Sequence, residues 1–129
     1  GYIMSALQRA AEVEIYFKAN WTATNIHIPD SSPPFSNNNL DKYIMLDVIN
    51  DGSNLVGLSC SEDGYSYAKV TCYHKVKKLC IGLSDDIKTF FDNKELPYDI
   101  RVKDGQQGIT VRLESGYFAT TVIFRVEQY

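Results

Sequence analysis

Two histidines, His27 and His74, are the side chains of this sequence best suited to acid–base chemistry near neutral pH. Neither lies in a known catalytic motif, because the sequence has no G-x-S-x-G, H-E-x-x-H, P-loop or G-x-G-x-x-G pattern. A cysteine nucleophile could be imagined beside either histidine, from Cys60, Cys72 or Cys80, but no spacing favours such a pair. The sequence therefore predicts a protein that is not an enzyme.

Metal-ligating residues are present without the spacing of a structural zinc site. Cys72 and His74 would share one strand face, with Cys80 on the next strand, but a fourth ligand has no obvious source. Calcium prefers oxygen ligands from loops, and acidic residues gather in the expected turns: Asp51, Glu62, Asp63, Asp85, Asp86 and Asp92. The same residues are typical of ordinary turns. We predict no cofactor, with calcium as the alternative.

Two cysteines would face one another if residues 72–80 form a hairpin. Cys72 and Cys80 would then either form a disulfide, leaving Cys60 unpaired, or remain reduced and buried. The triplet Asn20-Trp21-Thr22 matches the N-glycosylation pattern, and it slightly favours an extracellular or surface location that is otherwise unknown. The start of the chain lacks the pattern of a signal peptide.

Aromatic and amide side chains suggest a binding function. The sequence has nine Tyr and six Phe but one Trp, and Tyr suits both cross-strand packing and binding surfaces. Trp21 either fills the core or offers an exposed platform. We predict a non-enzymatic, lectin-like module that binds carbohydrate or another polar surface ligand. The predicted ligand-binding residues are Trp21, Asn37, Asn38, Tyr65 and Tyr67.

Charge limits the partners. The net charge of −3 gives no reason to expect nucleic acid, and no apolar run approaches the roughly 20 residues that span a membrane. A local basic cluster either binds an anionic membrane surface or lipid headgroup, or is a solvated hairpin tip. Its members are Lys69, His74, Lys75, Lys77 and Lys78.

Turn residues and alternating hydrophobicity predict the fold. At 129 residues the chain makes one domain. Residues 11–19 alternate as a half-buried strand, and residues 42–50 read as a central strand covered on both sides. Other strands are predicted at residues 24–28, 55–59, 65–74 and 76–83, with one helical turn at residues 87–91. We therefore predict an all-β, antiparallel β-sandwich, jelly-roll-like or a related two-sheet fold, of about eight or nine short strands.

The last third of the sequence reads as a three-stranded meander. Turns at Asp104-Gly105 and Ser115-Gly116 would place Ile109 between Ile100 and Val122 on one face. The sequence therefore predicts that Ile109 is buried in the core.

Residues 1–10 are predicted to be an N-terminal arm, followed by a single β-sandwich domain over residues 11–129. The arm would pack either on its own domain or on a neighbouring subunit. The second case predicts a structural subunit of a capsid, fibre or pilus, assembling as a homo-oligomer through the arm.

Overall fold

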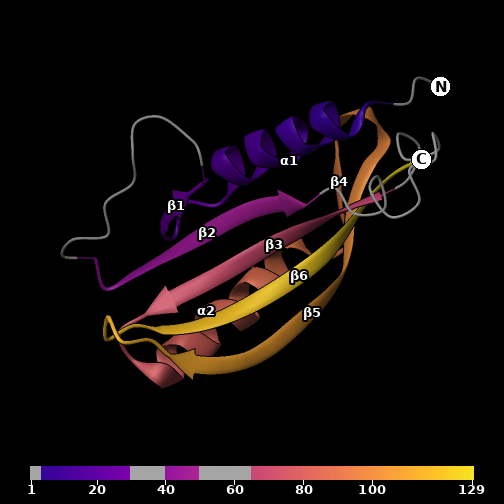
Figure 1. The fold of residues 1–129 in the computed structure, drawn as a ribbon. Helices are drawn as coiled ribbons and strands as arrows, with labels where there is room; N and C mark the ends of the chain where they lie inside the picture. The colour runs from indigo at the N-terminus through magenta and orange to yellow at the C-terminus, as the bar shows by residue number, and fades with distance from the viewer. Residues whose placement is uncertain (1–3, 30–39, 50–64) are drawn as a thin grey trace, which may run out of the picture.

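The computed structural model describes residues 4–29, 40–49 and 65–129 of the chain (Figure 1). The described elements are α1 (Ala6–Asn20), β1 (Asn25–His27), β2 (Lys42–Ile49), β3 (Tyr65–His74), α2 (Lys77–Phe91), β4 (Lys94–Leu96), a 3₁₀ turn (Pro97–Asp99), β5 (Ile100–Arg112) and β6 (Phe118–Gln128).

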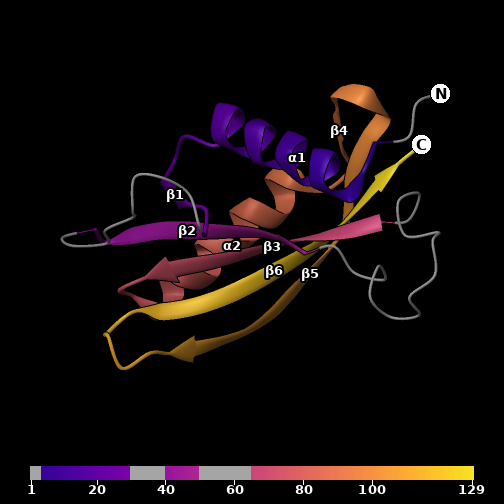
Figure 2. The same cartoon turned by 45° about the horizontal axis from the view of Figure 1, so that its top comes forward.

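The strands form one mixed sheet in the order β1-β2-β3-β6-β5-β4. β1 runs parallel to β2, and every other neighbouring pair is antiparallel. The sheet curls into a half-barrel, and both helices lie on its concave side (Figures 1 and 2). The prediction of an all-β sandwich was therefore wrong, because a layer of helices takes the place of the expected second sheet.

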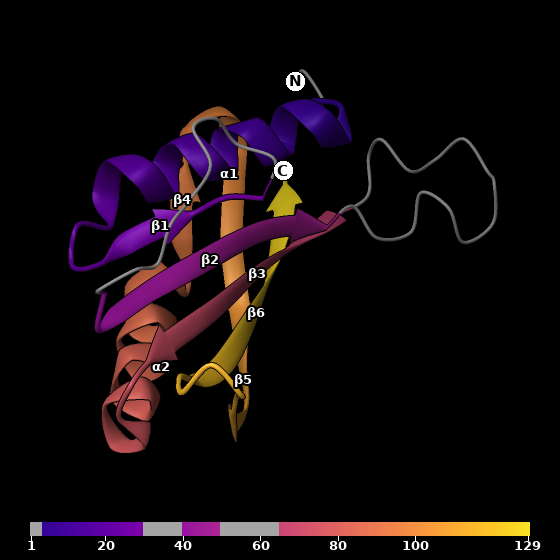
Figure 3. The same cartoon turned by 60° about the vertical axis from the view of Figure 1, so that its left-hand side comes forward.

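The two helices cover different parts of the sheet. α1 contacts β2, β3 and β4, whereas α2 contacts β3, β5 and β6 (Figure 3). The start of α1 is held on its own chain, since the Met4 backbone N–H donates to Gln128 Oε1 at 2.7 Å. The buried Arg9 side chain also donates from Nε to Ser66 Oγ at 3.2 Å. Residues 6–10 of the predicted arm belong to α1, which continues to Asn20 across the expected boundary at residues 10 and 11.

α1 replaces the strand that was predicted over residues 11–19. Ser5 caps the helix, because its hydroxyl accepts from the Gln8 backbone N–H while the Gln8 side chain accepts from the Ser5 backbone N–H. Val13 and Phe17, one helical turn apart, are fully buried, whereas Ile15 between them is largely exposed. Burial thus follows the helical period rather than the strand period.

α2 replaces the strand that was predicted over residues 76–83. The buried residues of this helix recur at helical spacing on one side: Cys80, Leu83, Ser84, Ile87 and Phe91. The predicted single turn at residues 87–91 is the last part of α2. A short apolar run such as Leu79–Leu83 does not distinguish a strand from a helix by itself, and the longer repeat decides the matter here.

Aromatic rings join the two helices to the sheet. Phe17 of α1 and Phe91 of α2 are stacked with centroids 3.6 Å apart, and Phe124 of β6 meets Phe91 edge-on at 6.4 Å. All three side chains are fully buried. The core is therefore a single cluster between the helices and the concave face of the sheet.

The predicted turn at Asp104-Gly105 was wrong. The predicted register was also one residue off, since Val111 pairs with Ala119 rather than Thr120, and this changes the face of Ile109. β5 continues through these residues, with irregular pairing to β6 between Lys103 and Gln106 and between Gln107 and Thr110. Asp104 takes a positive φ of 58°, so the residues form a bulge rather than a hairpin loop. Ile109 is 84% exposed, contrary to the predicted burial.

Several predicted elements are confirmed. Strands over residues 24–28, 42–50 and 65–74 match β1, β2 and β3 within a residue or two at their ends. The turn at Ser115-Gly116 is in the predicted place, and Gly116 has a φ of 96° that favours glycine. The connection is longer than the predicted two-residue loop, because Arg112 rather than Leu113 pairs with Phe118. The predicted strand at residues 55–59 lies outside the described residues.

Candidate functional site

The structure places Trp21 in the core. It follows α1 directly and is 6% exposed, with its ring edge-on to Phe90 at 5.4 Å. The indole Nε1–H donates to Thr24 Oγ1 at 2.8 Å, so its polar group is satisfied within the protein. This is the geometry of a core residue, which leaves little of the ring for a ligand.

The other predicted binding residues do not gather around Trp21. Tyr67 is half-buried on β3 opposite Arg125, on the convex face of the sheet, whereas Trp21 packs against the concave side. The backbone of Tyr65 pairs with Glu127 on β6. Asn37 and Asn38 lie outside the described residues. A common binding site of these side chains therefore stays a prediction. The β-sandwich prediction also included a lectin-like, carbohydrate-binding and secreted character, and nothing in the described part of the chain supports it.

His74 ends β3 and is held as a hydrogen-bond acceptor. Its Nδ1 accepts from the Val76 backbone N–H at 3.0 Å, so the neutral ring carries its proton on Nε2. Burial lowers the pKa of His74, and the nearby Lys42 lowers it further, against a smaller opposite effect of Asp41. The ring can thus donate a hydrogen bond from Nε2, but it is poorly arranged to act as a base.

The predicted basic cluster is divided by the fold. Lys75, Lys77 and Lys78 are exposed around the start of α2, and Lys75 lies 3.8 Å from the Asp41 carboxylate. Lys69 is on the convex face in the middle of β3. The predicted hairpin tip is therefore a strand-to-helix junction, and a membrane-binding role of its lysines stays a prediction. Neither described helix is long and apolar enough to cross a membrane.

Cys72 and Cys80 are free, buried thiols. The Cys80 thiol donates to the Cys72 carbonyl at 3.3 Å and lies 3.4 Å from Thr120 Oγ1. Burial raises the pKa of both thiols, so neither forms the reactive thiolate readily at neutral pH. Of the two alternatives for this pair, the structure has the reduced thiols.

Among the described residues, no group of three or more His, Cys, Asp or Glu side chains is placed to hold a metal ion. Of the candidate calcium ligands, Asp85 and Asp86 lie on α2 and Asp92 caps its end, rather than sharing a loop. Asp51, Glu62 and Asp63 lie outside the described residues. The alternative of calcium binding stays untested.

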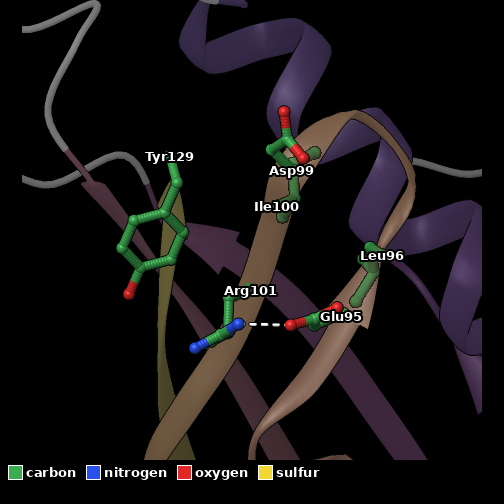
Figure 4. Close-up of a pocket in the computed structure, with 6 residues that line it drawn as sticks. All are labelled: Glu95, Leu96, Asp99, Ile100, Arg101 and Tyr129. Atoms are coloured by element: carbon green, nitrogen blue, oxygen red, sulfur yellow. Dashed lines mark hydrogen bonds and ion pairs between the residues drawn. The ribbon is translucent and has the colours of Figure 1, made fainter.

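A small polar pocket lies where β4 turns into β5, beside the end of β6 (Figure 4). The Glu95 carboxylate pairs with the Arg101 guanidinium at its edge, and Arg101 lies over the Tyr129 ring at 5.2 Å. The volume of about 150 Å³ is below the range of roughly 300–1,000 Å³ that is typical of small-molecule sites. Its lining holds two carboxylates, Glu95 and Asp99, against the single guanidinium of Arg101, which is already paired with Glu95.

The same end of the sheet carries a cross-strand charge network. The Glu127 carboxylate lies 3.0 Å from Lys103 Nζ and 2.9 Å from Arg125 Nε, and it accepts from the Tyr129 hydroxyl at 2.9 Å. The hydrogen bond from Lys103 lowers the pKa of Glu127, against a smaller opposite effect of burial. The arrangement ties β5 to β6 and has the character of a structural network.

Glu127→Gln is expected to lower the melting temperature at pH 7 and to have little effect in acid. A carboxyl whose pKa is lowered on folding stabilises the protein above its unfolded pKa of about 4.3, and this stabilisation is lost as the pH falls through the folded pKa. Thermal melting of both proteins from pH 7 to about pH 2 measures the difference. A difference of the same size at every pH would contradict a role of the ionised carboxylate.

The outward side of α1 carries an apolar row. Leu7, Ala11 and Ile15 follow one another at a spacing of four residues, so they lie on one face of the helix. Leu7 is 78% exposed and Ile15 59%, and Ala11 is also exposed, whereas the opposite side of α1 packs into the core. We call these three residues the α1 row.

The sequence contains evidence for a helix with the α1 row on one face, and the strand prediction did not take it into account. The Ser5–Gln8 capping box marks a helix start, and the apolar residues after it belong to two helical faces rather than one. One face holds Val13 and Phe17, and the other holds the α1 row.

Comparison of the chain with models of protein families, with curated proteins and with solved structures finds no match.

Proposed function

We propose that this chain is a non-enzymatic assembly subunit that binds another protein through the α1 row. The observation that carries the proposal is the exposure of Leu7 and Ile15 on a helix whose other side is already buried. A helix at the surface of a monomer normally turns polar residues to water, and one that is apolar on both sides is typically covered on both.

The charges around the α1 row fit a protein interface. Glu14 and Lys18 lie beside the row, one turn apart, and can form a polar rim of both signs. An apolar row with a mixed rim suits the apolar surface of another protein better than a sugar or a nucleotide, which need convergent hydrogen-bonding groups. The proposal retains the structural-subunit hypothesis and moves the contact from an extended arm to a helix face.

The state of the titratable groups supports a function without catalysis. His74 accepts a hydrogen bond at Nδ1, and the thiols of Cys72 and Cys80 are buried with raised pKa values. Within the described residues, none of these groups is arranged as an activated nucleophile with a neighbouring base.

A photo-crosslinking amino acid at position 11 tests the proposal in the cells that make the protein. We expect one discrete crosslinked product, which is lost when Leu7→Lys is added. Leu7→Lys alone should leave the melting temperature nearly unchanged, because exposed substitutions typically shift the free energy of unfolding by less than about 0.5 kcal/mol.

The matched control places the crosslinker at position 114, an exposed site in the β5–β6 turn, far along the chain from α1. The same product from both positions would show non-specific proximity. No discrete product from position 11, or a product that Leu7→Lys leaves intact, would show that the α1 row is not an interface.

A further inference from the structure

β5 has a long free edge. β4 pairs with β5 only at Ile100–Val102, so beyond that point β5 has β6 on one side and no described strand on the other. In Figure 1 this half of β5 forms the lower rim of the sheet, with β4 near its opposite end. The other two edge strands, β1 and β4, are three residues each, a length that limits pairing with a second chain.

Beyond Gly105, whose backbone N–H donates to Asp92 Oδ1 at 3.4 Å, the free edge has no charged residue or proline to hinder strand pairing before Arg112. Residues 105–111 read GQQGITV, without a charged residue or a proline. Ile109 is 84% exposed and Val111 44%, and Ile81 of α2 is also partly exposed on the side of α2 that packs beside β5. The two irregularities in β5 bend the strand but place no charged side chain among these residues.

The uncharged segment is bounded by opposite charges, Asp104 before it and Arg112 after it. Two copies of such a strand that run antiparallel bring Asp104 of each copy toward Arg112 of the other, at both ends of the contact. A two-fold interface requires this kind of self-complementarity, since the same surface serves both subunits. An unrelated extended segment would need the matching pattern by coincidence.

We propose that the β5 edge over residues 106–112 is a dimer interface, at which β5 of a second copy pairs antiparallel and joins the two sheets. Backbone hydrogen bonds across the new pair supply the specific contact, and burial of Ile109 and Val111 adds the apolar contact. This surface is separate from the α1 row, because α1 packs on β2, β3 and β4. The inference therefore does not depend on the proposed function.

Sedimentation velocity over a range of concentrations tests the interface, with Ile109→Lys as the disrupting variant. We expect the wild type to dimerise and Ile109→Lys to raise the dissociation constant by on the order of tenfold or more. Leu7→Lys is the matched control, since it also places a lysine at an exposed apolar site. It should dimerise as the wild type does, which separates this interface from the α1 row.

Hydrogen exchange locates the contact. Edge amides within residues 106–112 should become protected as the wild type dimerises and stay unprotected in Ile109→Lys. Arg112→Glu places like charges at both ends and should also weaken the dimer, less so at high salt. A wild type that stays monomeric overturns the proposal, as does a dimer that Ile109→Lys leaves intact. The proposal would also be overturned if the amides of this edge became protected only when an extended segment of another protein was added.

Discussion

Phe91→Ala is expected to lower the free energy of unfolding by about 3–5 kcal/mol, through lost apolar contacts and the cavity left behind. Phe91, the last residue of α2, is fully buried between α1 and the sheet. Its ring centroid lies 3.6 Å from that of Phe17, 5.9 Å from that of Trp21 and 6.4 Å from that of Phe124. Since single domains are stable by only about 5–15 kcal/mol, such a loss approaches complete unfolding. Urea unfolding followed by circular dichroism measures it.

Phe90→Ala is the control for this prediction. Phe90 is the preceding residue on α2 and is only partly buried at the margin of the core, in contact with Trp21. Phe90→Ala should therefore lower the free energy of unfolding by clearly less than Phe91→Ala does. Equal losses for the two variants would contradict the central position of Phe91 between the helices and the sheet.

Gly105→Ala is expected to destabilise the protein by about 1–3 kcal/mol, because the new methyl group overfills the core. A Cβ atom at this position would lie 2.8 Å from Phe124 Cε1 and 3.2 Å from Lys88 Cγ. The Lys88 side chain can move aside, but the Phe124 ring is fully buried and has no room to turn away. Thermal melting and urea unfolding both report the change.

Gly108→Ala is the matched control in the same strand. Its Cβ would meet only the Thr121 carbonyl, at an ordinary distance of 3.5 Å, so this variant should be close to neutral. Such a substitution can even stabilise slightly, because alanine restricts the unfolded chain. If Gly105→Ala and Gly108→Ala had the same stability, the close approach of β5 to Phe124 would be wrong.

The comparison of β6 with β5 shows why one strand could be predicted and its neighbour could not. Apolar and polar residues alternate over residues 124–127 of β6, and the glycine at 116 marks the turn before the strand. β5 contains Asp104-Gly105, which by itself is one of the strongest turn signals. Pairing with the long partner β6 continues on both sides of that signal, and the turn is replaced by a bulge at Asp104.

Local pattern also misassigned both helices, for a related reason. Val13, Ile15 and Phe17 alternate as a strand would, and the same residues fit a helix that has two apolar sides. The strand assignment required Ile15 to be buried with the other two, whereas the helix turns it outward. The choice depends on what packs against each side, which is a tertiary property.

Local sequence patterns predicted the strands β1, β2, β3 and β6 and the position of the turn at Gly116, since period and turn chemistry act over a few residues. Tertiary contacts account for three other features: two helices line one curled sheet, Trp21 lies in the core, and Ile109 lies on a free edge. Burial depends on contacts between segments far apart in the chain, and a one-residue difference in strand register moves a side chain from the core to water. Both proposed interfaces follow from apolar residues whose exposure becomes visible only in the folded chain.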